Sequence, residues 1–515
     1  MNDSVFLDFD YLMNDLFIHN DINHIGDMNI LRRGRLSVEQ DEDIKGFTSS
    51  MEADKRIFDA DIDVDKAHVV MLGEQDIINS KDCKDILAAL DKIKEEGISA
   101  LDASYEDVHI ALEAKLIEIV GEDTGGRMHS GRSRNDEVAT CIRLSLRTEL
   151  IGLMEEVEDL VSTLIVTAQK HHETIMPGYT HTQHAQPTTL AHHLLAHVNA
   201  FLRDLERIKG AYQRTNQNPL GAAAFASTGF PIDRKRTTEL LGFDQVISNS
   251  MDAVSTRDFM IESIGCYANL MTSLCRLAEE LILWSSSEFN FIELDDMYSS
   301  TSSIMPQKKN PDIAELTRAK TGTVHGALMS VLVICKALPY SYNRDLQEAT
   351  PHLWRATDNA RSSVRMTEGM VRTMKIKNEK MKKGIGIGFM SATELADTIV
   401  RTTGVPFRTA HHIVGTGAKS ERSPTLSDLD ELSLKIIGEK LSDRGLSEKT
   451  VKDALDPMKN INKRRIPGGP APEETKRQVT VLKKELGSMK YDNESIRKKI
   501  NSAAERLDKA CQNYF

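Results

Sequence analysis

The chain has 515 residues and a formal net charge of −12 at pH 7, which permits a large core and argues against nucleic acid or an anionic membrane as its main partner. Its six cysteines are scattered without a CxxC pair, which predicts neither a disulfide framework nor a thiolate zinc site and is typical of a reduced, cytoplasmic protein. No apolar run approaches the ~20 residues that a membrane span requires, and no signal-peptide pattern is found, so we expect a cytoplasmic location.

The start of the chain is acidic and unlike a targeting segment. Residues 1–27 contain six aspartates and no Lys or Arg, so they lack the basic region of a signal peptide and the arginines of a transit peptide. We expect an N-terminal extension, either a disordered leader or a start codon placed too early, with Met28 as the alternative start. The competing interpretation is an amphipathic helix, whose apolar face would contain Phe6, Phe9, Leu12, Leu16 and Phe17.

Helical periodicity dominates the rest of the chain. Similar three- and four-residue steps in 257–284, 312–338 and 354–374, and an apolar series near the C-terminus, predict further long helices in an all-α fold. Gly/Pro-rich breaks place boundaries near residues 131 and 380. We therefore expect an N-terminal helical domain (28–130), a central long-helix bundle (131–380) and a C-terminal helical domain (381–515). The clearest apolar face of a bundle helix is formed by Leu150, Met154, Val157, Val161, Leu164 and Ala168.

The first loop that contains candidate functional residues is "GGRMHSGRSRND" (125–136). It contains three arginines, Arg127, Arg132 and Arg134, and planar guanidinium groups suit bidentate binding of carboxylates. An ordinary polar helix entry would explain Asn135 and Asp136 but not three arginines so close together.

The second loop, "PGYTHTQHAQPTTLAHH" (177–193), is rich in histidine, the natural proton carrier near neutral pH. A metal site needs consideration because His193 and His197 are spaced i, i+4. The residues between them supply neither a carboxylate nor the HExxH pattern. We therefore favour a pair of helix-surface histidines over a metal site.

The third segment, "TSSIMPQKKNP" (301–311), precedes an expected helix start at Pro311 and Asp312. Ser302, Ser303, Lys308 and Asn310 would then lie before a helix N-terminus, where backbone N–H groups favour anions. A solvated surface loop is the alternative. The fourth segment, "YSYNRDLQEATPHLW" (340–354), is by itself typical of a capped turn between helices.

Taken in order, these segments resemble those of the argininosuccinate lyases, a family of the aspartase/fumarase superfamily, from about residue 31 to about residue 472. The forms "GRSRND", "PQKKNP" and "YNRDLQE" indicate this branch rather than fumarases, aspartases or adenylosuccinate lyases. Further matching pieces are "LRRGRLS", "SSMEADKRIFDADI", "EDVHIALEAKL", "PLGAAAFASTGFPIDR", "DAVSTRDF", "VPFRTAHHIVG" and "GGPAP".

The resemblance implies a three-domain, all-α aspartase/fumarase-like fold whose central helix bundle forms the core of a homotetramer. It implies reversible elimination of argininosuccinate to arginine and fumarate, the last step of arginine biosynthesis, without a metal or organic cofactor. Each active site would be shared among subunits. A sister lyase acting on another succinyl compound is the nearest alternative, and a catalytically silent structural protein such as a lens crystallin is the alternative from another class.

The resemblance also implies roles for individual residues. Ser302 would be the base, Lys308 would stabilise the developing charge, and His181, paired with Glu315 and beside Thr180, would serve the leaving nitrogen. Substrate binding is implied for Ser50, Asp54, His109, Ser133, Arg134, Asn135, Asn310, Tyr342 and Gln347.

Two positions depart from the family pattern. Thr301 stands where many relatives have glycine, and a β-branched residue would stiffen the approach to a closing lid. Thr350 stands where many relatives have a lysine that contacts substrate, so one expected cation is missing. We expect Arg344 or another arginine to occupy that space.

Overall fold

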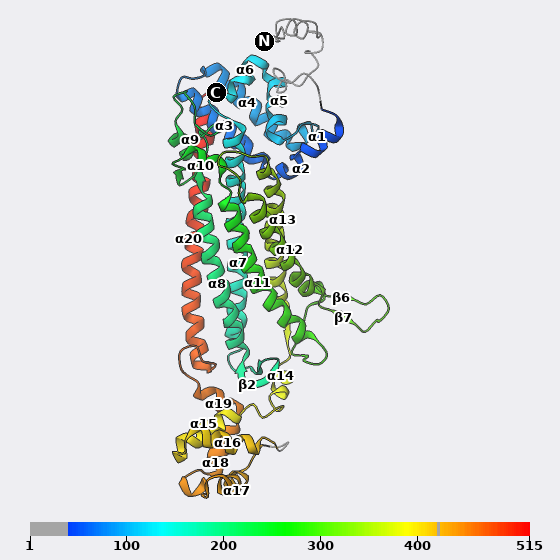
Figure 1. The fold of residues 1–515 in the computed structure, drawn as a ribbon, viewed down its shortest axis with the longest axis vertical. Coiled ribbons are helices and arrows are strands. Elements are labelled where there is room, and N and C mark those ends of the chain that lie inside the picture. The colour runs from blue at the N-terminus through cyan, green and yellow to red at the C-terminus, as the bar shows by residue number, and fades with distance from the viewer. Residues whose placement is uncertain (1–39, 420–422) are drawn as a thin grey trace, which may run out of the picture.

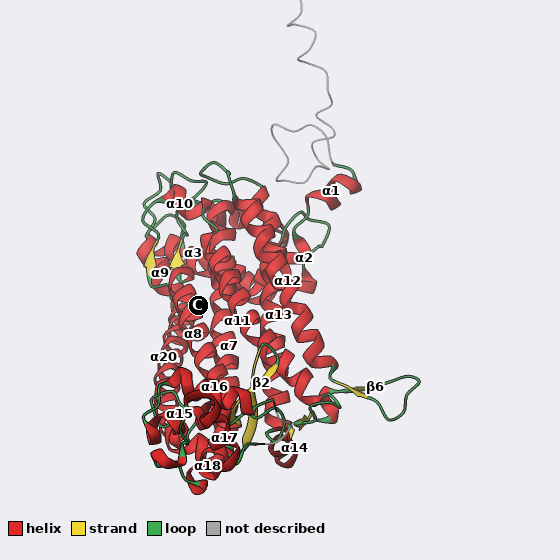
Figure 2. Cartoon of the chain, turned by 60° about the horizontal axis from the view of Figure 1, so that its bottom comes forward, coloured by secondary structure: helices red, strands yellow, loops and turns green. Residues whose placement is uncertain are grey.

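Residues 40–419 and 423–515 are described by a computed structural model, and the expectations for residues 1–27 lie outside these ranges. The described chain consists mainly of α-helices, with strands confined to four two-stranded sheets (Figure 2). The predicted all-α fold is therefore confirmed. None of the described helices is long and apolar enough to cross a membrane.

Long helices form a bundle along the longest axis of the molecule (Figure 1). The predicted apolar face of α7 (Arg134–Lys170) is confirmed, because its six residues from Leu150 to Ala168 are all buried in the main core. Burial of that face on neighbouring helices is the main source of helix stability in such a bundle. The bundle helices are α7 (Arg134–Lys170), α8 (Leu190–Thr215), α11 (Asp258–Ser285), α12 (Asp312–Cys335), α13 (Asp345–Thr373) and α20 (Pro472–Gln512).

Helix α13 begins earlier than the sequence indicates. The predicted turn over 340–354 is wrong from Asp345 onward, because the helix starts there and continues through Pro351. A proline inside a helix removes one backbone hydrogen bond. Here the cost is offset by burial of apolar side chains at helical spacing, namely Leu346, Ala349 and Leu353.

Shorter helices cover the end of the bundle where α7 begins (Figure 1). Most of their buried apolar side chains belong to the same core cluster as those of the bundle, so the core continues across the expected boundary at residue 131. These helices are α1 (Glu42–Thr48), α2 (Met51–Asp54), α3 (Phe58–Glu74), α4 (Ser80–Glu96), α5 (Val108–Val120), α6 (Glu122–Gly125), α9 (Arg234–Leu241) and α10 (Ser250–Ser255), with 3-10 turns η2 (Lys55–Ile57), η3 (Ile98–Ala100) and η4 (Gly126–His129).

The opposite end of the bundle carries a second, separate core that includes Leu395, Ile413 and Ala454. Helix α20 leaves this region and runs back along the bundle, so the C-terminus lies near α3 and α4 (Figure 1). The predicted C-terminal helix is confirmed, but it packs on α7 and α8 rather than with the rest of 381–515, because Leu482 and Leu507 join the main core. The region contains α14 (Asn378–Gly384), α15 (Ala392–Thr403), α16 (Phe407–Gly417), α17 (Leu426–Ile437), η6 (Ser442–Arg444), α18 (Glu448–Leu455) and α19 (Pro457–Lys463).

Two hairpins interrupt the helices near this second end. Antiparallel strands β1 (Ile175–Thr180) and β2 (Gln183–Thr189) join through His181 and Thr182, both with positive φ, as a type I′ hairpin turn requires. Strands β6 (Ser300–Thr301) and β7 (Lys309–Asn310) form the base of a loop that projects away from the bundle (Figures 1 and 2). The remaining pairs are parallel β3 (Gln217–Asn218) with β4 (Gln245–Val246), and antiparallel β5 (Ile292–Glu293), which precedes η5 (Asp296–Tyr298), with β8 (Lys375–Ile376).

Candidate active site

A cavity of about 320 Å³ lies where α7 and α13 begin, bordered by α2 and α5. It brings together side chains from segments that are far apart in the sequence, and eight of the nine residues predicted to bind substrate line it. Only Asn310 lies elsewhere. The eight residues are Ser50, Asp54, His109, Ser133, Arg134, Asn135, Tyr342 and Gln347.

The start of α7 fixes one wall of this cavity. Ser133 caps the helix in a capping box with Asp136, whose Oδ1 accepts a hydrogen bond from the Ser133 backbone N–H. The Oδ2 atom of Asp136 accepts hydrogen bonds from the backbone N–H groups of Gly221 and Ala223, each 2.8 Å. Burial raises the pKa of Asp136 to about 6. Asn135 donates from Nδ2 to the Ala224 carbonyl oxygen at 3.0 Å. The loop of residues 219–227 is thereby held against the N-terminus of α7.

The arginines of "GRSRND" have different roles in the structure. Arg132 is buried and pairs with Asp65 and, at 2.9 Å, with Glu137, so it stabilises the core below the cavity. Arg134 faces the cavity and pairs with Asp107 at 2.8 Å. Outside this motif, Arg127 pairs with the exposed Asp123. Of the three arginines that the sequence grouped together, only Arg134 lies at the cavity.

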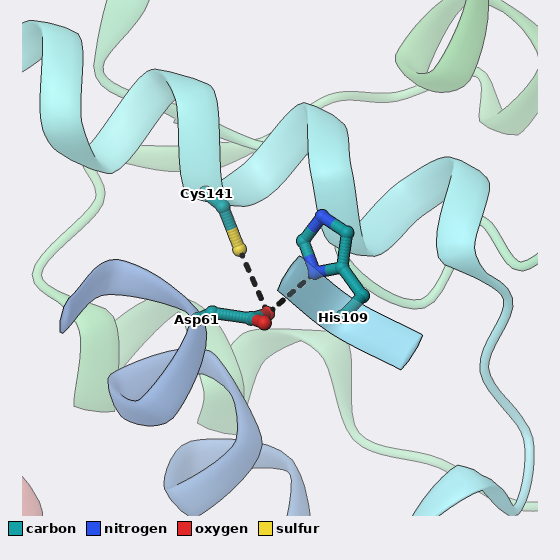
Figure 3. A group of neighbouring side chains, drawn as sticks. All are labelled: Asp61, His109 and Cys141. Carbon is teal, nitrogen blue, oxygen red and sulfur yellow. Dashed lines mark hydrogen bonds and ion pairs between the residues drawn. The ribbon is translucent and has the colours of Figure 1, made fainter. Parts of the chain in front are cut away.

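His109 pairs with Asp61, which does not itself line the cavity (Figure 3). Its Nδ1 lies 2.8 Å from Asp61 Oδ1, and both side chains are buried. Burial disfavours the imidazolium, but the Asp61 carboxylate outweighs this effect and the pKa of His109 lies well above its usual value. Nε2 of His109 has no hydrogen-bond partner among the described residues, which leaves this nitrogen available to a ligand.

Cys141 completes the group drawn in Figure 3. Its Sγ lies 3.4 Å from the same Asp61 oxygen. Complete burial raises the pKa of this thiol well above its usual value, so it remains protonated and donates to the carboxylate. Helices α3, α5 and α7 each contribute one residue, and the group therefore ties α5 and α7, which border the cavity, to α3.

Asp54 is the carboxylate of the cavity that is best placed to bind a cationic ligand. It accepts a hydrogen bond of 2.5 Å from Ser50 Oγ, and burial raises its pKa to about 6. Glu106 pairs with Arg344 at 2.5 Å, and Asp107 is occupied by Arg134. Among the described residues, no lysine or arginine forms a salt bridge with Asp54.

The predicted catalytic residues lie near the other end of the bundle. Thr180 and His181 stand at the tip of the β1–β2 hairpin, Glu315 lies in the first turn of α12, and Ser302 and Lys308 lie on the β6–β7 loop. Within the described chain, no hydrogen bond or ion pair joins His181 to Glu315, so that pairing stays a prediction.

Ser302 has a distinctive environment on this loop. Its Oγ accepts hydrogen bonds from the backbone N–H groups of Ile304 and Met305, at 3.3 and 3.1 Å. Asn310 donates from Nδ2 to Ser300 Oγ at 3.4 Å. Thr301 belongs to strand β6 and is not among the residues with positive φ. A β-branched residue suits that strand position, so the departure from glycine creates no backbone strain.

The two groups of residues are separated by the length of α12. This helix has 24 residues, which corresponds to about 36 Å at 1.5 Å per residue. Asn310 lies just before its start, and Tyr342 follows its end. A single chain therefore does not bring the cavity and the β6–β7 loop into one site.

The structure supplies a carboxylate for the His193–His197 pair that spacing could not reveal. Glu280, on α11, accepts from both histidines at one oxygen, at 2.8 Å from His193 Nε2 and 2.6 Å from His197 Nε2. Burial alone would raise the pKa of Glu280, but these hydrogen bonds lower it to about 2. The trio ties α8 to α11. The predicted lack of a metal is not tested by this geometry.

Several cavity residues were not assigned from the sequence. Arg257 belongs to the matching piece "DAVSTRDF" but received no role, although an arginine directly before a bundle helix is a recognisable signal. Thr350, noted as a departure, does line the cavity. The other unassigned side chains there include Glu106, Asp107, His129 and Arg344.

Comparisons with known proteins cover nearly the whole chain. Residues 34–326 match a family model described as Lyase, and residues 389–462 match one described as Argininosuccinate lyase C-terminal. The argininosuccinate lyase of Methanosarcina barkeri is 62% identical over 479 residues, covering 93% of this chain and 98% of that protein. The enzyme of the same name from Methanosarcina mazei is 61% identical and covers 94% and 99%. A solved structure of an EDDS lyase variant with bound fumarate superposes with a TM-score of 0.83 at 33% identity, covering 89% of this chain and 92% of that one.

Proposed function

Since the chain belongs to the argininosuccinate lyase family, we propose that it cleaves argininosuccinate reversibly to arginine and fumarate, the last step of arginine biosynthesis. The cavity is the main structural support, because it gathers eight residues that the resemblance assigns to substrate binding. Fumarate bound in the related EDDS lyase variant agrees with this chemistry. A cytoplasmic location is included in the proposal and fits six free cysteines.

The first chemical task is removal of a proton next to a carboxylate. The resulting carbanion spreads its charge onto that carboxylate, so cationic and N–H donors must point at it. Lys308, Asn310 and the N-terminus of α12 are suitable donors. Ser302 is the proposed base. The two backbone N–H groups that already donate to its Oγ would stabilise an alkoxide at this position, because hydrogen bonds to the charged form favour that form.

The second task is to polarise or protonate the leaving guanidinium nitrogen. We assign this side of the reaction to His181, with Thr180 as a neighbouring donor. Both residues are exposed at the tip of a hairpin, where they can reach a substrate held by another surface. Glu315 would pair with His181 and keep its ring oriented.

The proposed site is assembled from subunits of a homotetramer. The cavity and the β6–β7 loop are about 36 Å apart along α12, so each site must combine the cavity of one subunit with the loop of a neighbour. Exposed apolar side chains support such packing, since large exposed apolar residues mark protein interfaces. They occur on the loop and on α12 and include Ile304, Met305, Leu316, Met329 and Val333.

Mixing two inactive variants tests the shared site. Ser302→Ala removes the proposed base, and Gln347→Trp fills the cavity with a larger side chain. We expect mixed tetramers, formed by co-expression, to regain activity in about a quarter of their sites, because each site draws its loop and its cavity from different subunits. Release of fumarate is the measurement.

A matched mixture of Ser302→Ala with Lys308→Ala controls this test. Both changes lie on the same loop, so no intact loop exists in any subunit and activity should stay absent. If the Ser302→Ala and Gln347→Trp mixture forms tetramers and remains inactive, the shared-site proposal is wrong.

The raised pKa of Asp54 predicts how substrate affinity depends on pH. Asp54 must be ionised to bind the substrate guanidinium, and burial places its pKa at about 6. KM for argininosuccinate should therefore rise as pH falls below 6. Asp54→Asn should raise KM at pH 8 and remove this pH dependence.

The same shift predicts an effect on stability. Burial raises the pKa of Asp54 from 3.8 to about 6 in the folded protein. The free energy of unfolding therefore falls as pH rises from the lower to the higher of these values, and the loss is complete above pH 6. Asp54→Asn should thus raise Tm at pH 8 and change it less at pH 5.

For substrate binding, a KM that follows the same pH profile in Asp54→Asn as in the wild type would show that another group controls binding.

A further inference from the structure

Arg257 is a buried cation in the wall of the cavity. It directly precedes α11, is 3% exposed, and lines the cavity together with Tyr342 and Thr350. Its Nη1 donates to two backbone carbonyl oxygens, at 3.1 Å to Val254 and 2.8 Å to Thr256. Nε has no partner, and no carboxylate forms a salt bridge with this guanidinium anywhere in the described chain. Arg257 therefore has unused hydrogen-bonding capacity.

The other arginines of the cavity already have carboxylate counter-ions. Arg134 pairs with Asp107, and Arg344 pairs with Glu106 while also donating to the Thr48 carbonyl oxygen at 2.7 Å. A buried charge without a counter-ion is unfavourable, and burial lowers the pKa of Arg257. A bound anion would remove this penalty, whereas Arg134 and Arg344 already have their counter-ions.

Thr350 adds no charge to this wall of the cavity. It is 5% exposed and lines the cavity together with Arg257, but it offers only a hydroxyl. The unpaired positive charge of Arg257 is therefore not duplicated at Thr350.

We propose that Arg257 binds a carboxylate of the substrate through the part of its guanidinium group that has no partner in the protein. This inference rests on the proposed function. In the proposed active site, the loop with Ser302, Lys308 and Asn310 binds the succinyl half of argininosuccinate. The carboxylate left for the cavity is that of the arginine half, whose guanidinium meets Asp54. Arg257 is therefore a substrate-binding residue for the arginine end.

Product inhibition separates the two halves of the substrate. Arg257→Gln should raise KM for argininosuccinate and the inhibition constant for arginine about tenfold or more, as expected for loss of a charge-assisted hydrogen bond in a buried site. The inhibition constant for fumarate should stay unchanged. Loss of fumarate inhibition instead of arginine inhibition would overturn the assignment to the arginine end.

Thr350→Lys supplies the second arm of the test and does not require removal of Arg257. In the wild-type background we expect weaker substrate binding, because the new ammonium group would repel Arg257. In the Arg257→Gln background, Thr350→Lys should restore some of the lost affinity for arginine. A lower KM for the Thr350→Lys single variant would show that Arg257 does not bind the substrate carboxylate. This outcome would decide the question even if Arg257→Gln failed to fold.

Arg143→Gln is the matched control. Arg143 is also buried, and among the described residues its guanidinium donates only to backbone carbonyl oxygens, those of Arg214 and Thr215 at 2.9 and 3.1 Å. It does not line the cavity. Its replacement should lower Tm without raising KM. A folded Arg257→Gln variant with wild-type affinity for arginine would refute this inference alone, whereas a wild-type protein unable to cleave argininosuccinate would refute the proposed function.

Discussion

Ser302→Ala is expected to lower kcat by about three orders of magnitude or more while leaving tetramer assembly and substrate binding intact. The change removes the proposed base but opens no cavity in the core, since Ser302 lies half-buried on the projecting β6–β7 loop. Initial rates of fumarate release, Tm and calorimetric binding of argininosuccinate to the variant together test this expectation.

Ser303→Ala is a suitable control for the Ser302 variant. Ser303 is exposed on the same loop, and no hydrogen bond of its side chain is found among the described residues. Its replacement should leave kcat close to the wild-type value. Wild-type-like turnover in Ser302→Ala, or an equal loss in Ser303→Ala, would mean that Ser302 is not the base and that the loop acts only by closing over the substrate.

Local sequence patterns predicted the helices well where burial and periodicity agree. The face of α7 from Leu150 to Ala168 follows from spacing alone, because a helix that packs along one side must repeat its apolar residues every three or four positions. At the start of α13 the two signals disagree. Pro351 indicates a break, and only the tertiary burial of Leu353 and its neighbours allows the helix to continue.

The composition of the candidate site was predictable from motifs, but the division of roles within a motif was not. "GRSRND" shows cationic and polar residues close together, yet only the fold reveals that Arg132 faces Asp65 and that Arg134 faces the cavity. Such assignments depend on contacts between residues far apart in the chain. Glu280 was missed for the same reason, since it lies on a different helix from His193 and His197.

The two-ended arrangement of the site residues also has no signature in the local sequence. A motif states which residues share a function, but it does not state whether one subunit brings them together. The length of α12 decides this question, because it keeps Asn310 and Tyr342 at opposite ends of a rigid element. Assembly of subunits is therefore as necessary to the proposed chemistry as any single side chain.

His181→Asn is expected to lower kcat by about two to three orders of magnitude with a smaller change in substrate binding, as for loss of a general acid or base. Asparagine retains a polar side chain that fits the hairpin tip and tolerates positive φ, which His181 adopts there. The fold of the hairpin should therefore survive.

Two further variants decide how His181 acts. Glu315→Gln should give a similar but milder loss of kcat, because it removes the charge of the proposed partner without removing the imidazole. His184→Asn is the control, since His184 lies on the same hairpin with Nε2 3.4 Å from the Tyr179 hydroxyl, and it should retain kcat. If His181→Asn raised KM and left kcat unchanged, His181 would be a substrate contact outside the proton-transfer step. If Glu315→Gln had no effect while His181→Asn did, the partner of His181 would be a different group, because the proposed pairing requires the charge of Glu315 to reach the imidazole across the assembled site.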